Sequence, residues 1–107
     1  MSDLALSVYG ELWVSLASLL RSYTAVHGLN NDRQATVELG EERITVRHGE
    51  NWLDLKRNGS LVAWRREDGQ GGELELTEAG RLRSCKPSGG EEELDMAAEA
   101  WARELMQ

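Results

Sequence analysis

An Asn-Gly pair, Asn58-Gly59, is the strongest local folding signal in this chain of 107 residues. Asn-Gly between alternating hydrophobic residues is typical of a two-residue β-hairpin turn of type I′, because both central positions of that turn need positive φ. The turn predicts that Leu55 pairs with Val62 and that both side chains lie on one face of a sheet. The middle of the chain is therefore expected to form antiparallel strands.

Two further glycine turns support the same arrangement. Gly49-Glu50 and Gly40-Glu41 both suit a type II′ turn, which takes glycine at its first central position. The three turns, assigned separately, place aliphatic residues on the same face, and a slip of one residue in any turn would destroy that agreement. The predicted inward face consists of Ala35, Val37, Ile44, Val46, Leu53, Leu55, Val62 and Trp64.

The strand pattern continues to residue 85. Residues 73–77 alternate as a strand does, and Glu78-Ala79-Gly80 fits a three-residue hairpin that pairs Leu76 with Leu82. The glycine-rich stretch 68–72 leads into a strand and not into a helix, so it is interpreted as a hairpin connection and not as a phosphate-binding loop. Residues 34–85 are thus predicted to form an antiparallel meander of five to six strands.

A helix is predicted on each side of this meander. Residues 3–27 carry a broad apolar stripe with helical spacing, and Gly28 suits the position after a helix end. Residues 91–106 carry a second apolar stripe, and Ser88 with Glu91 matches a capping box at its start. The stripes consist of Ala5, Tyr9, Leu12, Trp13, Leu16, Leu19, Leu20 and Tyr23 in the first helix, and of Leu94, Ala97, Ala98, Trp101 and Leu105 in the second.

These elements predict a single α+β domain over residues 1–107, with both helices packed on one face of the sheet. The order helix, strands, helix resembles the frataxin-like fold. That resemblance implies the same architecture, and in that family an acidic first helix and the neighbouring strand handle iron. The first helix here offers only Asp3 and Glu11, so the iron site is not expected in this chain.

Composition excludes several classes of function. The net charge of −7 argues against general nucleic-acid binding, although ten of the twelve basic residues lie within residues 33–86. The single cysteine, Cys85, forms no internal disulfide and no zinc site by itself, and a lone thiol fits the cytoplasm. Asp3 stands where a signal peptide has its basic region, and Glu11 interrupts the apolar run from Leu4 to Leu20, so neither a signal peptide nor a membrane span is predicted.

The predicted outward face of the sheet holds the first candidate site. The register predicts a row of Arg47, Trp52 and Arg65 across three strands, with Arg43 and Lys56 close by. An exposed tryptophan between arginines makes cation–π contacts and has the composition that protein-binding hot spots favour. The alternative is that Trp52 shields the sheet and the arginines only solvate it.

A flank of the first helix is the second candidate. It consists of Leu6, Gly10, Val14, Ala17 and Arg21. Small residues allow close approach of helices, so this flank is a candidate homodimer contact. The alternative is that the flank contacts the sheet edge or the second helix.

No catalytic group, metal site or cofactor site is predicted. His27 and His48 lie apart, no carboxylate is expected to orient either, and Cys85 has no activating neighbour besides Lys86. The sequence therefore favours a non-enzymatic module that binds an acidic or extended segment of another protein. The alternative is a small acidic dimeric chaperone-like protein. Type III secretion chaperones are similar in size and acidity, but they insert a helix within the strand series, where Asn58-Gly59 leaves no room.

Overall fold

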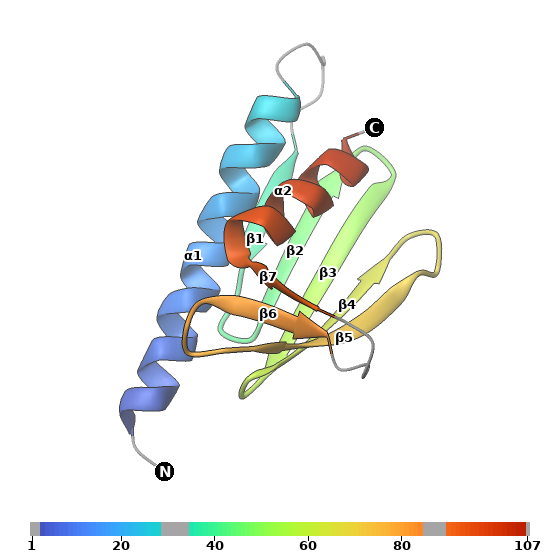
Figure 1. Cartoon of the computed structure of the whole chain (residues 1–107). Coiled ribbons are helices and arrows are strands. Elements are labelled where there is room, and N and C mark those ends of the chain that lie inside the picture. The colour runs from blue at the N-terminus through green and yellow to red at the C-terminus, as the bar shows by residue number, and fades with distance from the viewer. Residues whose placement is uncertain (1–2, 29–34, 85–89, 107) are drawn as a thin grey trace.

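The computed structural model describes residues 3–28, 35–84 and 90–106, with two helices and seven strands in them. The strands form one antiparallel sheet in the order β1-β2-β3-β4-β5-β6-β7, and both helices pack on the same face of it (Figure 1). The predicted α+β class and the placement of the helices are thus confirmed. The elements are α1 (Asp3–His27), β1 (Thr36–Leu39), β2 (Arg43–His48), β3 (Asn51–Asn58), β4 (Leu61–Arg66), β5 (Gly71–Leu76), β6 (Arg81–Ser84), β7 (Glu91–Glu93) and α2 (Leu94–Leu105).

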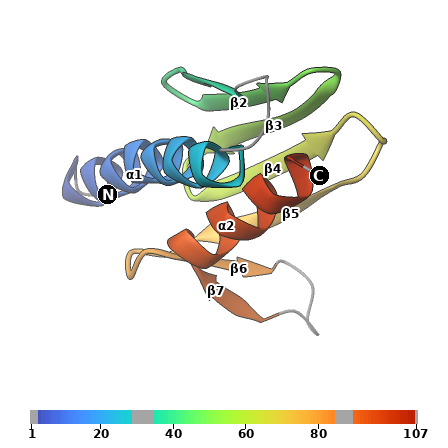
Figure 2. The same ribbon diagram turned by 90° about the horizontal axis from the view of Figure 1, so that it is seen from above.

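The hydrophobic core lies between the two helices and the sheet. Alternation along β2, β3 and β4 sends every second side chain to this side, as the sequence predicts. The most deeply buried large side chains are Trp13, Leu16, Leu20, Ile44, Val46, Leu53, Leu55, Val62 and Leu76. In Figure 2 the sheet curves around the helices, and no described helix or strand lies over its other face.

Two of the four predicted hairpins have the register that the sequence predicts. Val46 pairs with Leu53 across the Gly49 turn, and Leu76 pairs with Leu82 across the Gly80 turn. Gly49 and Gly80 have φ of 63° and 79°, a region in which other residues are strained. In these turns the need for positive φ fixes the position of the glycine and thereby the pairing.

The hairpin at Asn58-Gly59 differs from the prediction. Asn58 pairs with Leu61, so the central residues of the turn are Gly59 and Ser60, and Leu55 pairs with Trp64 instead of Val62. Gly59 has φ of 63°, whereas no non-glycine residue of the described chain has positive φ, which corresponds to a type II′ turn. The register is therefore shifted by two residues, and a shift by an even number keeps every side chain on its predicted face.

The first hairpin shows the same kind of shift. Val37 pairs with Val46 instead of Ile44, and the Gly40 amide donates a hydrogen bond to the Arg43 carbonyl at 2.7 Å. The central residues of this turn are therefore 41 and 42, and Gly40 belongs to the closing pair. Here too the faces are retained while the partners change.

The seventh strand, β7, corrects the prediction of a helix over residues 91–106. Residues 91–93 pair with β6, and α2 begins at Leu94 with Glu93 as an N-cap that makes no side-chain hydrogen bond. The predicted capping box is wrong, because Glu91 lies in a strand; Ser88 lies outside the described residues. Cross-strand pairing explains the difference: Glu91 faces Arg83 and Glu93 faces Arg81, and opposite charges stabilise such pairs. Tertiary pairing here outweighs the helical preference of glutamate.

The glycine-rich connection between β4 and β5 is a tight hairpin, as predicted, but it is shorter than residues 68–72. The Arg66 amide donates to the Gln70 carbonyl at 2.8 Å, and Gly69 has φ of 87°. Gly71 and Gly72 already belong to β5, where Gly72 lies against Trp64. Residues 68–70 therefore lie in the turn, and residues 71–72 are part of the sheet.

Candidate functional site

The candidate site is the uncovered face of the sheet, opposite the helices. Alternation in β2, β3 and β4 places five side chains on it that share exposure to solvent and a cationic or aromatic character: Arg43, Arg47, Trp52, Lys56 and Arg65. We call these five residues the basic patch. Trp52 remains 38% exposed, although a tryptophan is normally covered in a folded domain. The structure thus brings together all five residues that the sequence nominates for protein binding.

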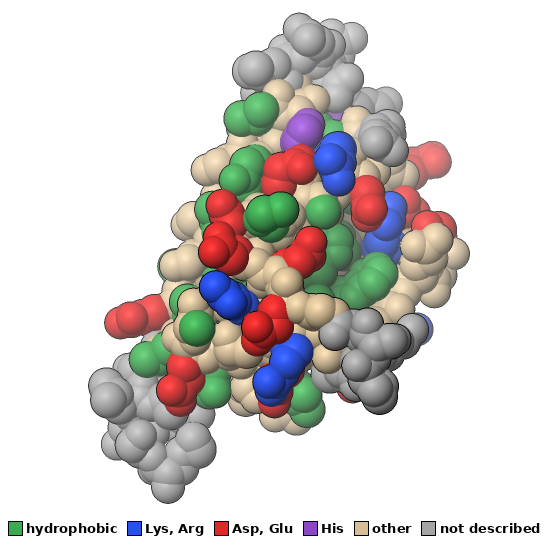
Figure 3. Space-filling model, in the orientation of Figure 1, with side chains coloured by type: hydrophobic (Ala, Val, Ile, Leu, Met, Phe, Trp, Pro, Cys, Tyr) green, Lys and Arg blue, Asp and Glu red, His purple; other side chains and the backbone are tan. Residues whose placement is uncertain are grey.

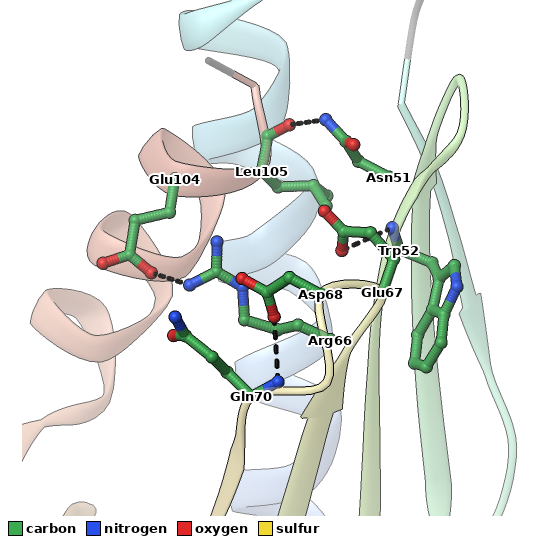
Figure 4. Close-up of polar contacts among 8 residues, drawn as sticks. All are labelled: Asn51, Trp52, Arg66, Glu67, Asp68, Gln70, Glu104 and Leu105. Carbon is green, nitrogen blue, oxygen red and sulfur yellow. Dashed lines mark hydrogen bonds and ion pairs between the residues drawn. The ribbon is translucent and has the colours of Figure 1, made fainter.

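The arrangement within the basic patch differs from the predicted row. Arg47 lies directly opposite Trp52, as expected, but Arg65 pairs with Asp54. The cause is the two-residue shift of the β3–β4 hairpin, which moves Arg65 along β4 without changing its face. Trp52 instead receives an acidic neighbour, because its backbone N–H donates to Glu67 Oε2 at 3.3 Å (Figure 4).

Asp54 is the counter-charge of the basic patch. It is only 8% exposed, and its oxygens accept hydrogen bonds from Arg43 Nε at 2.7 Å and Arg43 Nη2 at 3.1 Å. The Thr45 hydroxyl donates a third hydrogen bond, at 3.2 Å. The hydrogen bond and charge of Asp54 raise the pKa of Arg43. Arg43 is thus held by a bidentate pair, which occupies two of its N–H donors and reduces its capacity to bind a partner.

The other three cations of the patch differ from Arg43. Arg47, Lys56 and Arg65 have no ion pair with any carboxylate in the described ranges. All three are exposed. They are therefore available to the carboxylates of a partner, whereas Arg43 and Asp54 form a fixed centre between them.

Two open hollows lie on either side of this centre. One, of about 300 Å³, is lined by Arg47, Trp52 and the Arg43–Asp54 pair. The other, of about 660 Å³, is lined by Lys56, Leu61 and Ala63 but also by Glu42 and Glu73, and Leu61 is 46% exposed. The smaller hollow combines a cation with apolar surface and suits an acidic side chain of an extended segment, whereas the two glutamates of the larger hollow partly offset its positive charge.

The rest of the uncovered face has a different character. On β5 to β7, Glu75 forms an ion pair with Arg83, and Arg81 lies 3.8 Å from Glu91. Glu73 adds an acid opposite Ala63, and Glu93 adds another opposite Arg81. Cations are matched or outnumbered there, so the surplus of positive charge is confined to β2, β3 and β4.

The proposed dimer flank of α1 is only partly exposed. Val14 is 52% exposed and Arg21 is exposed, while Gly10 is half-buried. Ala17 is fully buried in the core, so it does not contribute to an outward contact, and this part of the prediction is wrong. The Leu6 side chain lies outside the described part of the structure.

The histidines differ from the prediction in one respect. His27 Nε2 lies 2.8 Å from Glu99 Oε2 on α2, and Glu99 also pairs with Arg103 at 3.3 Å. The expectation that no carboxylate orients His27 is therefore wrong; the partner is 72 residues away in the sequence, and no local pattern indicates it. His48 lies at the end of β2, half-buried. Cys85 and Lys86 lie outside the described residues.

A search of the described residues finds no group of three or more histidine, cysteine or acidic side chains that would hold a metal ion. In the same residues no helix is both long and apolar enough to cross a bilayer. Comparison with known protein families, with curated proteins and with solved structures gives no match to this chain.

Proposed function

We propose that this protein is a non-enzymatic interaction module whose basic patch binds an acidic, extended segment of another protein in the cytoplasm. The observation that carries the proposal is the exposed Trp52 beside Arg47, on the sheet face opposite both described helices. Tryptophan and arginine are the residues most enriched in binding hot spots. Their position on rigid strands means that little conformational entropy is lost on binding.

The charge distribution supports an acidic partner. The whole chain has a net charge of −7, so most of its surface repels acidic segments, and the basic patch is a local exception. Arg47, Lys56 and Arg65 supply charge, while Trp52 and Leu61 supply apolar area. Charges of this kind accelerate encounter and fix orientation more than they raise affinity, so association is expected to slow as salt increases.

A second candidate function is a small acidic chaperone-like dimer. Its support comes from apolar side chains exposed on the helices, since Val14 is 52% and Met96 60% exposed. In that case the helices, and not the sheet, make the contacts. The two candidates place the partner on opposite sides of the molecule and are separable by surface variants.

The test is an affinity capture from native lysate with three matched baits. One is the wild type, and the second is the triple variant Arg47→Glu, Trp52→Ala, Arg65→Glu. The third, Arg21→Glu with Arg103→Glu, makes the same change of net charge on exposed helix positions. Circular dichroism and thermal unfolding first establish that all three fold alike.

The three baits give distinct outcomes. A protein held by the wild type and the helix variant, but lost from the sheet variant, supports the basic patch. A protein lost only from the helix variant supports the dimeric alternative. Equal capture by all three baits contradicts binding through the patch. Salt dependence of the captured complex, measured with purified partner, then checks that the contact is electrostatic.

A further inference from the structure

A cleft of about 420 Å³ lies on the covered side of the sheet, between α2 and strands β4 to β6. Its floor is apolar and consists of Trp64, Leu74, Leu82, Ala97 and Trp101. Figure 3 views this side of the molecule and shows hydrophobic side chains at the bottom of a hollow, with acidic and basic side chains around it. The volume lies in the range of small-molecule sites, which are mostly apolar with a few placed polar groups.

Two tryptophans make a corner in this cleft. The rings of Trp64 and Trp101 have centroids 6.3 Å apart and planes inclined at 55°. Trp64 can occupy this position because its cross-strand partner on β5 is Gly72, which has no side chain. A Cβ on Gly72 would lie 2.9 Å from Trp64 Nε1. On α2, Ala97 and Ala100 line the cleft with small side chains. Gly72, Ala97 and Ala100 are thus small residues beside the two tryptophan rings, and they leave the cleft open.

The rim of the cleft is acidic. Glu92 on β7 is exposed and points to the covered side, since its cross-strand partner is the buried Leu82. Among the lining residues that the structure describes, Arg66 is the basic one, and its Nη1 donates a hydrogen bond to Glu104 Oε2 at 2.7 Å (Figure 4). That pair is neutral, and Glu92 has no cationic partner among residues 3–28, 35–84 and 90–106. The faces of aromatic rings also carry negative potential, so both the floor and the rim favour a cation.

From this combination we infer that the cleft binds a small organic cation through an alkylated ammonium group seated in the corner of Trp64 and Trp101. A methylated ammonium is weakly hydrated and has an apolar surface, so it matches an aromatic floor better than a metal ion or a bare ammonium does. Glu92 provides the long-range attraction. This site lies on the opposite side of the sheet from the basic patch and is independent of the proposed protein partner.

The experiment uses two probes of the same shape and different charge, choline and 3,3-dimethylbutan-1-ol. The four tryptophans give four indole N–H signals in a proton–nitrogen NMR spectrum of the full chain. Choline at millimolar concentration is expected to shift the signals of Trp64 and Trp101, while those of Trp13 and Trp52 stay in place. The neutral alcohol is expected to bind at least about fivefold more weakly, the ratio for roughly 1 kcal/mol of cation–π attraction.

Three variants sharpen the test. Glu92→Gln is expected to weaken choline binding about two- to fivefold, as for an exposed charge. Trp64→Leu, once shown to fold, is expected to weaken it roughly fivefold or more. The matched control Glu78→Gln, an exposed acid in the β5–β6 turn, is expected to leave the affinity unchanged. Equal binding of both probes, shifts at Trp52 instead of Trp64, or no shift at all would overturn the inference.

Discussion

The two faces of the sheet are made by alternate residues of the same strands, and they differ in chemistry. One face is apolar and buried, and the other is charged and exposed. On β3, Leu55 is fully buried beneath the helices, while its neighbours Asp54 and Lys56 lie on the uncovered face. The covered face holds the apolar contacts that stabilise the fold. The uncovered face holds the basic patch, whose exposed charges contribute little to stability. Stability and the proposed binding are therefore expected to be separable by position along one strand.

Truncation of adjacent residues on β3 is the strongest test of this separation. Leu55→Ala removes a fully buried side chain from the core and is expected to lower the free energy of unfolding by about 2–5 kcal/mol. Lys56→Ala, one residue further, is expected to change it by no more than about 0.5 kcal/mol. Urea unfolding followed by circular dichroism measures both. A Lys56 effect comparable with that of Leu55 would contradict the division between the faces.

A glycine on the covered face offers the next largest effect. Gly72→Ala brings a Cβ within 2.9 Å of Trp64 Nε1, so the indole ring has to move. The expected loss is about 1–2 kcal/mol of unfolding free energy, as for overpacking of a core. The control is Gly90→Ala, where an added Cβ meets nothing within 4 Å. If both variants unfold at the same urea concentration, the Trp64 ring is not held against β5. Its place in the lining of the cleft would then be contradicted.

Asp54 tests whether the uncovered face contributes to stability at all. Asp54→Asn removes the carboxylate that accepts two hydrogen bonds from Arg43, and about 1 kcal/mol of unfolding free energy is expected to be lost. The same change frees Arg43 and is expected to tighten binding of an acidic partner. The matched control Glu73→Gln also removes one negative charge from this face but frees no arginine of the patch. Tighter binding by Glu73→Gln than by Asp54→Asn would show that net charge alone, and not the release of Arg43, controls the affinity.

Much of this separation is readable from the sequence because strand alternation has a period of two. The hairpins at Gly40 and Gly59 are each displaced by two residues from the prediction, and still no side chain changes face. Register, in contrast, determines which residues are neighbours within a face. For that reason the five residues of the basic patch lie on the face where the sequence places them, but Arg65 lies beside Asp54 and not beside Trp52.

Features that depend on the packing of distant elements are not readable in this way. Glu91, Glu92 and Glu93 resemble the first turn of a helix until β6 is placed beside them. The ion pairs His27–Glu99 and Arg66–Glu104 join residues 72 and 38 positions apart. The cleft with Trp64 and Trp101 likewise appears only when α2 is placed over β4 and β5. Each of these requires the position of a helix or strand that no local pattern fixes.

At Trp52 a contribution to stability is hardest to separate from the proposed binding, because a tryptophan on a sheet also packs on its neighbours. Trp52→Thr retains a residue of high strand preference, and the expected loss is about 0.5 kcal/mol of unfolding free energy, measured by urea unfolding. The same variant is expected to lose most of the partner captured through the basic patch. A stability loss above about 1.5 kcal/mol with capture unchanged would give Trp52 a structural role. Its exposure would then no longer indicate a binding surface. Both faces of the sheet would contribute to stability, and they would differ only in how much.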